Sequence, residues 1–224
     1  ATMKNLVVLT AGLSNPSTTR LLADQISAAV RSQVGKRGEG LEVEFVEIRE
    51  YAQDLANFMT SHVASAHLQA AQEKISAADA LVAVTPVFSA SYSGLFKMFI
   101  DALSPDSLNG MPVLIAATAG TARHQLVLDF AMRPLFTYLR ATVMPTGVFA
   151  ATEDFGGGDG GQGMVPRVER AASELAGYIV RTEGEVAGLG PAEYRGGALK
   201  RDAGTRVQSG GLDFASMLKG HTGE

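Results

Sequence analysis

Short apolar runs alternate along the chain with longer segments in which hydrophobic residues recur at helical spacing. Leu6-Val7-Val8-Leu9-Thr10 is continuously hydrophobic, which is typical of a strand covered on both faces of a parallel sheet. Runs of this kind, together with one alternating run, predict strands at residues 6–10, 41–48, 80–84, 112–118 and 143–149. Helical spacing predicts helices at residues 18–34, 67–78, 94–103, 123–140 and 166–182.

This order of elements predicts an α/β fold, a doubly wound five-stranded parallel sheet with helices on both faces. Pro134 is expected to kink or break the helix at residues 123–140, because proline has no backbone N–H to donate. Glycine and charged residues dominate the last part of the chain. We therefore expect residues 1–183 to form one domain and residues 184–224 to form a mobile tail or an oligomer arm.

Composition narrows the possible functions. The 224 residues carry a formal net charge of −4 with basic residues spread singly, which argues against a nucleic-acid surface. Cysteine is absent, which excludes disulfides, thiolate catalysis and zinc–thiolate sites. His62 and His67 have no partner at ligand spacing, so we expect no metal. Without a long apolar stretch, neither a signal peptide nor a membrane span is expected, and a cytoplasmic location is the simplest interpretation.

The loops that follow the predicted strands are the places to look for a ligand, since open parallel sheets bind ligands at the carboxyl ends of their strands. The first loop spans residues 12–20, and after Pro16 it presents the free N–H groups of a helix start. These donors can bind a phosphate, although an ordinary helix cap rich in Ser and Thr has the same composition. The hydroxyl side chains of this loop are Ser14, Ser17, Thr18 and Thr19.

Two further loops have compositions suited to a flat ring. Residues 85–94 combine a proline, an aromatic residue and small hydroxyl residues before a helix, which fits either the wall of a heterocycle site or a plain strand-to-helix connection. Residues 117–124 are small and allow close approach of the backbone to a ligand. His124 lies in the first turn of the next helix, where histidine is more often a capping or packing residue than a catalytic one.

The second and third loops together resemble the NADPH-dependent FMN reductase family. The resemblance rests on Thr-Pro-Val-Phe-x-x-Ser-Tyr-Ser-Gly-Leu-Phe-Lys from Thr85 to Lys97, and on Ala-Thr-Ala-Gly-Thr-Ala-Arg-His from Ala117 to His124. It covers roughly residues 4–180 and is strongest to flavin reductases of two-component monooxygenase systems. It implies a flavodoxin-like FMN-binding domain at residues 1–183 that uses FMN and NAD(P)H, with a homodimer or homotetramer as the assembly.

The resemblance also assigns roles to residues in the three loops. Ser17, Thr18 and Thr19, with Ser14 nearby, would hold the FMN phosphate. The isoalloxazine would be lined by Pro86, Val87, Phe88, Ser89 and Ser91. Thr118, Ala119, Gly120 and His124 would border its pyrimidine edge. No catalytic acid or base is implied, because the flavin carries the chemistry.

The sequence departs from the family at three places. Phe88 and Phe130 stand where relatives often carry tyrosine, and the first loop has no arginine before Pro16. The missing arginine suggests loosely bound FMN and favours a reductase that releases reduced flavin to a partner monooxygenase. An FMN-containing quinone or azo-dye reductase, or a flavodoxin-type electron carrier, stays open as an alternative. No ribose-reading motif is recognisable, so the choice between NADH and NADPH is open as well.

Overall fold

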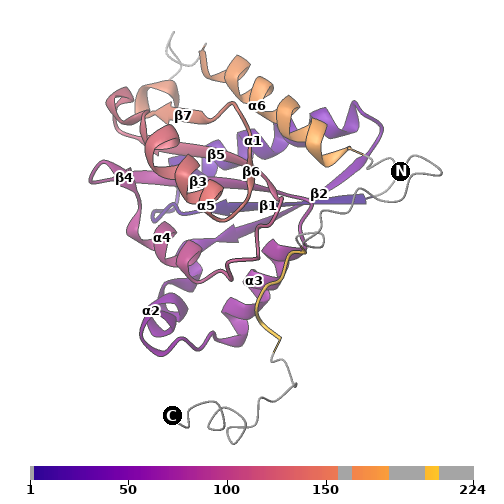
Figure 1. Ribbon diagram of the computed structural model, residues 1–224. Helices are drawn as coiled ribbons and strands as arrows, with labels where there is room; N and C mark the ends of the chain where they lie inside the picture. The colour runs from indigo at the N-terminus through magenta and orange to yellow at the C-terminus, as the bar shows by residue number, and fades with distance from the viewer. Residues whose placement is uncertain (1–2, 156–162, 182–199, 207–224) are drawn as a thin grey trace, which may run out of the picture.

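The computed structural model describes residues 3–155, 163–181 and 200–206, which form a central sheet between two layers of helices (Figure 1). The main strands are parallel and follow the order β2-β1-β3-β5-β6, as in flavodoxin-like sheets. They are β1 (Met3–Thr10), β2 (Gly40–Glu47), β3 (Ala80–Phe88), β5 (Pro112–Ala119) and β6 (Thr142–Val143), with β7 (Val148–Ala151) also pairing with β5. The predicted fold class is confirmed, with β6 and β7 as two pieces of the predicted fifth strand.

The helices divide between the two faces of the sheet. On one face lie α1 (Thr18–Gly35) and α6 (Met164–Ile179). The other face is covered by α2 (Ala52–Ser61), α3 (Ala66–Ala77), α4 (Gly94–Asp101) and α5 (Arg133–Tyr138). Strand β1 shows why the fold needs both layers: Leu6 and Val8 are fully buried toward α1 and α6, whereas Val7 and Leu9 are fully buried toward the opposite layer.

Three local predictions were wrong. Residues 52–61, for which no helix was predicted, form α2, whose only fully buried side chain is Leu55. The predicted loop after residue 84 continues β3 to Phe88 and turns back into β4 (Ser91–Tyr92). The predicted long helix at residues 123–140 is a 3₁₀ turn (Ala122–His124), a π-helix (Leu128–Met132) and α5. The predicted break at Pro134 is present: the π-helix ends at Met132, and α5 begins with Pro134 in its first turn, where a proline needs no backbone N–H.

The part of the C-terminal region that is described packs against the domain. The Nη1 of Arg201 donates to the carbonyl of Ala78, and the hydroxyl of Thr205 bonds Glu73 at 2.7 Å. The expected mobile tail at residues 184–224 otherwise lies outside the described residues and stays a prediction. Within the described ranges, no helix combines the length and the apolar character of a membrane span. The expected cytoplasmic location is not tested by this finding.

Candidate functional site

A cavity of about 320 Å³ lies at the carboxyl ends of β1, β3 and β5, next to the point where the strand order reverses. Segments from four parts of the chain meet there, and all but three of the predicted site residues line it. The lining residues are Gly12, Leu13, Ser14, Ser17, Thr18, Thr19, Pro86, Val87, Phe88, Thr118, Ala119, Gly120 and Thr152. None of these carries an ionisable side chain, so the cavity offers hydroxyls, backbone groups and apolar atoms.

The first wall is the start of α1. The hydroxyl of Ser17 caps this helix by accepting from the backbone N–H of Arg20 at 3.2 Å, which leaves the N–H groups of Thr18 and Thr19 as the donors at the helix terminus. Gly12 is required for this arrangement, since a Cβ at this position would lie 2.1 Å from the Ser17 hydroxyl and 3.2 Å from the Thr19 Cβ. The helix start therefore presents neutral N–H donors with the positive end of the helix dipole behind them, an arrangement that can hold an anion.

Thr19 is the residue that joins this wall to the sheet. Its hydroxyl bonds the hydroxyl of Thr118 at 2.9 Å, and both side chains are buried, with 2% and 4% of their surface exposed. The bond connects α1 to the end of β5 across 99 positions of sequence. Thr19 was predicted as a phosphate ligand, and the structure gives its hydroxyl this internal partner.

The second wall is the β3–β4 hairpin, which carries Pro86, Val87 and Phe88 into the cavity. The two turn residues, Ser89 and Ala90, both have positive φ angles of 47° and 67°, as a two-residue hairpin turn demands. Phe88 is 48% exposed, so its ring is accessible to a ligand in the cavity.

Beneath the hairpin, Thr85 and Ser93 fix its base. Thr85 is fully buried, and its hydroxyl accepts from the backbone N–H of Ser93 at 3.1 Å. The hydroxyl of Ser93 in turn caps α4 by accepting from the N–H of Phe96. The hairpin therefore projects from a rigid base.

The third wall is the end of β5, where the hydroxyl of Thr152 donates to the carbonyl of Ala119 at 3.5 Å beside Gly120. A Cβ on Gly120 would meet no atom within 4 Å, so the space beside this glycine is free for a ligand. Three predicted residues lie outside the cavity lining: Ser89 in the exposed hairpin turn, Ser91 in β4 and His124 in the 3₁₀ turn.

Two arginines that had no predicted role, Arg20 and Arg49, lie beside the first loop and outside the lining of the cavity. Arg49 donates to the carbonyl of Ser14 at 3.3 Å and pairs with Glu47 at 3.1 Å. Arg20 pairs with the same Glu47 and with Asp24. Burial lowers the pKa of Arg20, but the hydrogen bonds to Asp24 and Glu47 outweigh it and hold that pKa above its usual value. Both guanidinium groups are thus already paired with carboxylates.

These features fit FMN. Donors for a phosphate stand at the start of α1, apolar side chains for the face of a ring stand on the hairpin, and backbone at Gly120 is open for its polar edge. None of the described residues that line the cavity is an acid or a base, and a bound flavin would bring its own redox chemistry.

Comparisons with known proteins agree with this geometry. The model of the family described as NADPH-dependent FMN reductase matches residues 4–156. The NADH-dependent FMN reductase SfnF of Pseudomonas putida is 37% identical over 150 residues, 67% of this chain and 78% of that protein. The FMN reductase (NADPH) of Escherichia coli is 34% identical over 129 residues, 55% of this chain and 65% of that protein.

Solved structures give the same result. An oxidoreductase from Corynebacterium diphtheriae is 56% identical, with a TM-score of 0.77, and the match covers 80% of this chain and 98% of that one. The apo form of the NADH:FMN oxidoreductase EmoB is 26% identical, with a TM-score of 0.60, over 79% of this chain and 86% of that one. The resemblance noted in the loop sequences is confirmed, and the chain belongs to the NADPH-dependent FMN reductase family.

Proposed function

We propose that this protein transfers hydride from NAD(P)H to FMN and releases the reduced flavin to a flavin-dependent monooxygenase. The observation that carries the proposal is the cavity at the strand ends, which joins a helix-terminus anion site to an apolar wall and contains no ionisable side chain. The relatives that match are named as FMN reductases, some NADH-dependent and some NADPH-dependent. The monooxygenase partner follows from the resemblance to two-component systems.

We assign the binding roles as follows. The N–H groups of Thr18 and Thr19 with the hydroxyls of Ser14 and Thr18 hold the phosphate, while the Ser17 hydroxyl and the Thr19–Thr118 bond keep the helix start in place. Pro86, Val87 and Phe88 line the ring face. Backbone at Thr118, Ala119 and Gly120 borders the pyrimidine edge.

The chain's residues act by orientation and exclusion of water. When bound, FMN supplies the hydride acceptor, N5 of its ring system. The apolar hairpin wall holds the ring in one plane and keeps water from its face, and the amide donors near Gly120 favour negative charge on the reduced ring. No side chain has to move a proton in this arrangement.

We also propose a homodimer or homotetramer. Leu126 and Phe130 on the segment after β5 are 59% and 78% exposed, and Tyr138 at the end of α5 is 83% exposed. Large apolar side chains that gather on neighbouring turns are typical of association surfaces. Light scattering at micromolar concentration measures the assembly directly, and a monomer would contradict this part of the proposal.

The test of the function is anaerobic oxidation of NADH and NADPH with FMN titrated from substoichiometric amounts to large excess. We expect turnover to saturate with free FMN and reduced flavin to accumulate beyond the enzyme concentration. Reduction that stops at one flavin per subunit and resumes only with a quinone or azo dye would show tightly held FMN and an acceptor reductase instead. If NAD(P)H is not oxidised with any acceptor, the result would favour a flavodoxin-type electron carrier instead of a reductase.

A further inference from the structure

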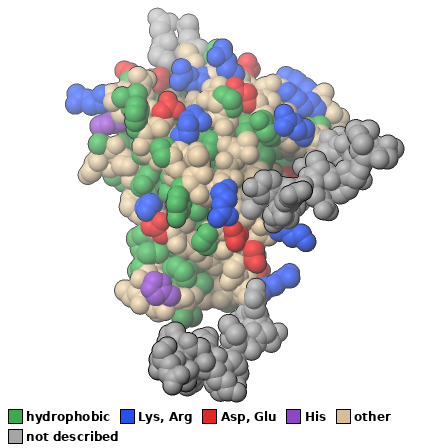
Figure 2. Space-filling view, viewed as in Figure 1, with side chains coloured by type: hydrophobic (Ala, Val, Ile, Leu, Met, Phe, Trp, Pro, Cys, Tyr) green, Lys and Arg blue, Asp and Glu red, His purple; other side chains and the backbone are tan. Residues whose placement is uncertain are grey.

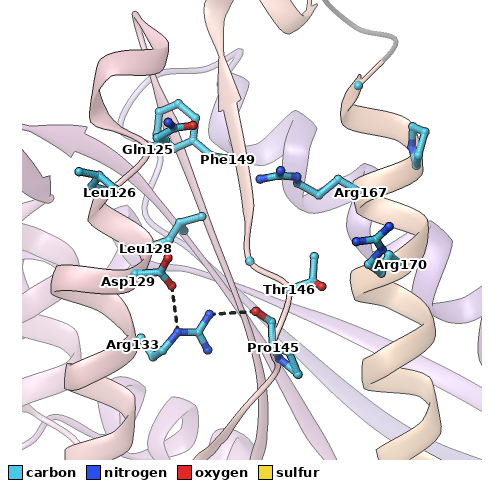
Figure 3. A pocket seen from close by; sticks show the side chains of 13 residues that line it. Gln125, Leu126, Leu128, Asp129, Arg133, Pro145, Thr146, Phe149, Arg167 and Arg170 are labelled. Atoms are coloured by element: carbon cyan, nitrogen blue, oxygen red, sulfur yellow. Dashed lines mark hydrogen bonds and ion pairs between the residues drawn. The ribbon is translucent and has the colours of Figure 1, made fainter.

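A second and larger cavity, about 570 Å³, lies at the open edge of the sheet beyond β7 (Figure 3). One side is formed by the π-helix at Leu128–Met132 and the start of α5, and the other side by α6. We call it the edge groove. The side chains that matter here are Thr146, Phe149, Arg133, Arg167 and Arg170.

The edge groove carries two positive charges that the described protein does not neutralise. Arg133 is engaged, because it bonds Asp129 at 3.0 Å and the carbonyls of residues 144 and 145 at 2.9 and 3.1 Å. Arg167 and Arg170 form no hydrogen bond or ion pair with any residue in the ranges 3–155, 163–181 and 200–206. Asp129 and Arg133 neutralise each other, so the net positive charge of the groove lining comes from Arg167 and Arg170.

The carboxylate best placed to neutralise Arg170 is used elsewhere. Glu174 lies four positions after Arg170 on α6, the spacing at which ion pairs form on a helix. Both of its oxygens instead hold Thr146, accepting from the backbone N–H at 2.9 Å and from the hydroxyl at 2.7 Å. Glu174 therefore holds the loop between β6 and β7, and Arg170 has no carboxylate partner within the part of the chain that the structure describes.

The two arginines are placed to hold one anion together. They are three positions apart on α6, so their side chains leave the helix on the same side, and Figure 3 shows both directed from α6 toward the strand and loop that cross the groove. Figure 2 shows several Lys and Arg side chains on the upper part of the molecule, where α6 runs, with Asp and Glu side chains between them. Guanidinium groups bind phosphate through paired N–H donors, which makes a phosphate the best-fitting ligand.

The edge groove and the flavin cavity meet at one strand. Phe149 of β7 lines the groove, and Thr152, immediately after β7, lines the flavin cavity. Three residues of extended chain span about 10 Å, so the upper rim of the groove lies within reach of a molecule whose reactive end is in the flavin cavity. A reduced nicotinamide dinucleotide has this shape, with its reactive ring at one end, its pyrophosphate in the middle and its adenosine, which carries the 2′-phosphate in NADPH, at the other end.

We infer that the edge groove binds the phosphate-bearing adenosine half of NAD(P)H, with Arg167 and Arg170 as the phosphate ligands. This assignment rests on the proposed function, because it places the second substrate of the same reaction. The half-buried ring of Phe149 gives the adenosine an apolar surface beside the two charges.

The test compares the wild type with the double variant Arg167→Gln/Arg170→Gln. Arg31→Gln is the matched control, because Arg31 is exposed on α1 and does not line either cavity. At low salt we expect the KM for the dinucleotide to rise about tenfold or more in the double variant, with kcat and the KM for FMN unchanged. The difference should shrink in high salt because the screening length falls.

Calorimetric titration with 2′,5′-ADP and with ADP supplies a measurement that does not depend on turnover. Weaker binding of 2′,5′-ADP, with KM raised only for NADPH, assigns the arginines to the 2′-phosphate. Weaker binding of ADP, with KM raised equally for NADH and NADPH, assigns them to the pyrophosphate. If the double variant binds both probes as the wild type does, the inference is overturned. An inactive wild type would contradict the proposed function, and the titrations would still decide the groove.

Discussion

The hydroxyl pair Thr19–Thr118 provides a sharp test of how the flavin cavity is held together. Replacing Thr19 with valine keeps the shape of the side chain and removes its hydroxyl. The Thr118 hydroxyl, on a residue only 4% exposed, then loses its one described side-chain partner at 2.9 Å. Leaving a buried polar group unsatisfied costs about 1–3 kcal/mol. Thr118→Val should cost a similar amount for the same reason.

The double variant Thr19→Val/Thr118→Val distinguishes this explanation from simple loss of packing. Replacing both partners with apolar groups of the same shape is close to neutral, so we expect the double variant to be more stable than either single one. Urea unfolding followed by circular dichroism measures the free energies. For a chain of this size each kcal/mol also shifts Tm by roughly 2–4 °C.

Flavin binding should follow the same pattern. Each single substitution loosens the start of α1 from the end of β5, so the Kd for FMN, measured by quenching of flavin fluorescence, should rise more in the single variants than in the double one. The reasoning is refuted if the single substitutions cost less than about 0.5 kcal/mol or if the double substitution costs their full sum.

Three further outcomes follow from the structure. Gly12→Ala should weaken both folding and FMN binding, whereas Gly120→Ala should leave the urea midpoint unchanged and weaken FMN binding alone, because only the first Cβ meets protein atoms. Hydrogen bonds, first from Ser65, lower the pKa of Asp54, so its contribution to stability is complete above about pH 5 and is lost as pH falls. The urea midpoint of Asp54→Asn should therefore change less with pH between about pH 3 and 5 than the midpoint of the wild type. Phe130→Asp should shift the light-scattering mass toward the monomer, and an unchanged mass would place the interface elsewhere.

Secondary structure was predicted correctly from the sequence where a strand is buried on both faces or where a helix buries a regular stripe of side chains. The strands around Leu6–Leu9 and Ala80–Val84 are buried on both faces, and their continuous hydrophobicity predicted this. The helix at residues 52–61 was missed although its apolar residues Leu55 and Met59 lie four positions apart and face the core, so the helical signal was present in the sequence. The hairpin after Thr85 was not predicted because its turn residues are Ser89 and Ala90. Both have positive φ angles, but neither is the glycine or asparagine that usually marks such a turn in a sequence.

In the candidate site, the positions of the loops could be predicted from the sequence, but the contacts between them could not. Loops that follow predicted strands could be assigned to one edge of the sheet from topology alone, and most of their residues line one cavity. Contacts between distant segments could not be predicted, since nothing in the first loop indicates that Arg49 donates to it or that Thr152 lines the same cavity. The helix cap that Ser17 forms was one of the alternatives left open by the sequence, whereas the bond between Thr19 and Thr118 is a property of the folded chain.

The charges around the first loop support weak retention of FMN. The sequence lacks an arginine before Pro16, and the two arginines that the fold brings to the outside of the loop share Glu47 as an ion-pair partner. Under the proposed binding mode, a phosphate at the start of α1 would meet neutral N–H and hydroxyl donors, because carboxylates already hold both guanidinium groups. Neutral hydrogen bonds contribute about 0.5–1.5 kcal/mol each, against about 1.5–3 kcal/mol for bonds to charged groups. A reductase that must hand its reduced flavin to another enzyme benefits from this difference, because product release then does not have to break a charged contact.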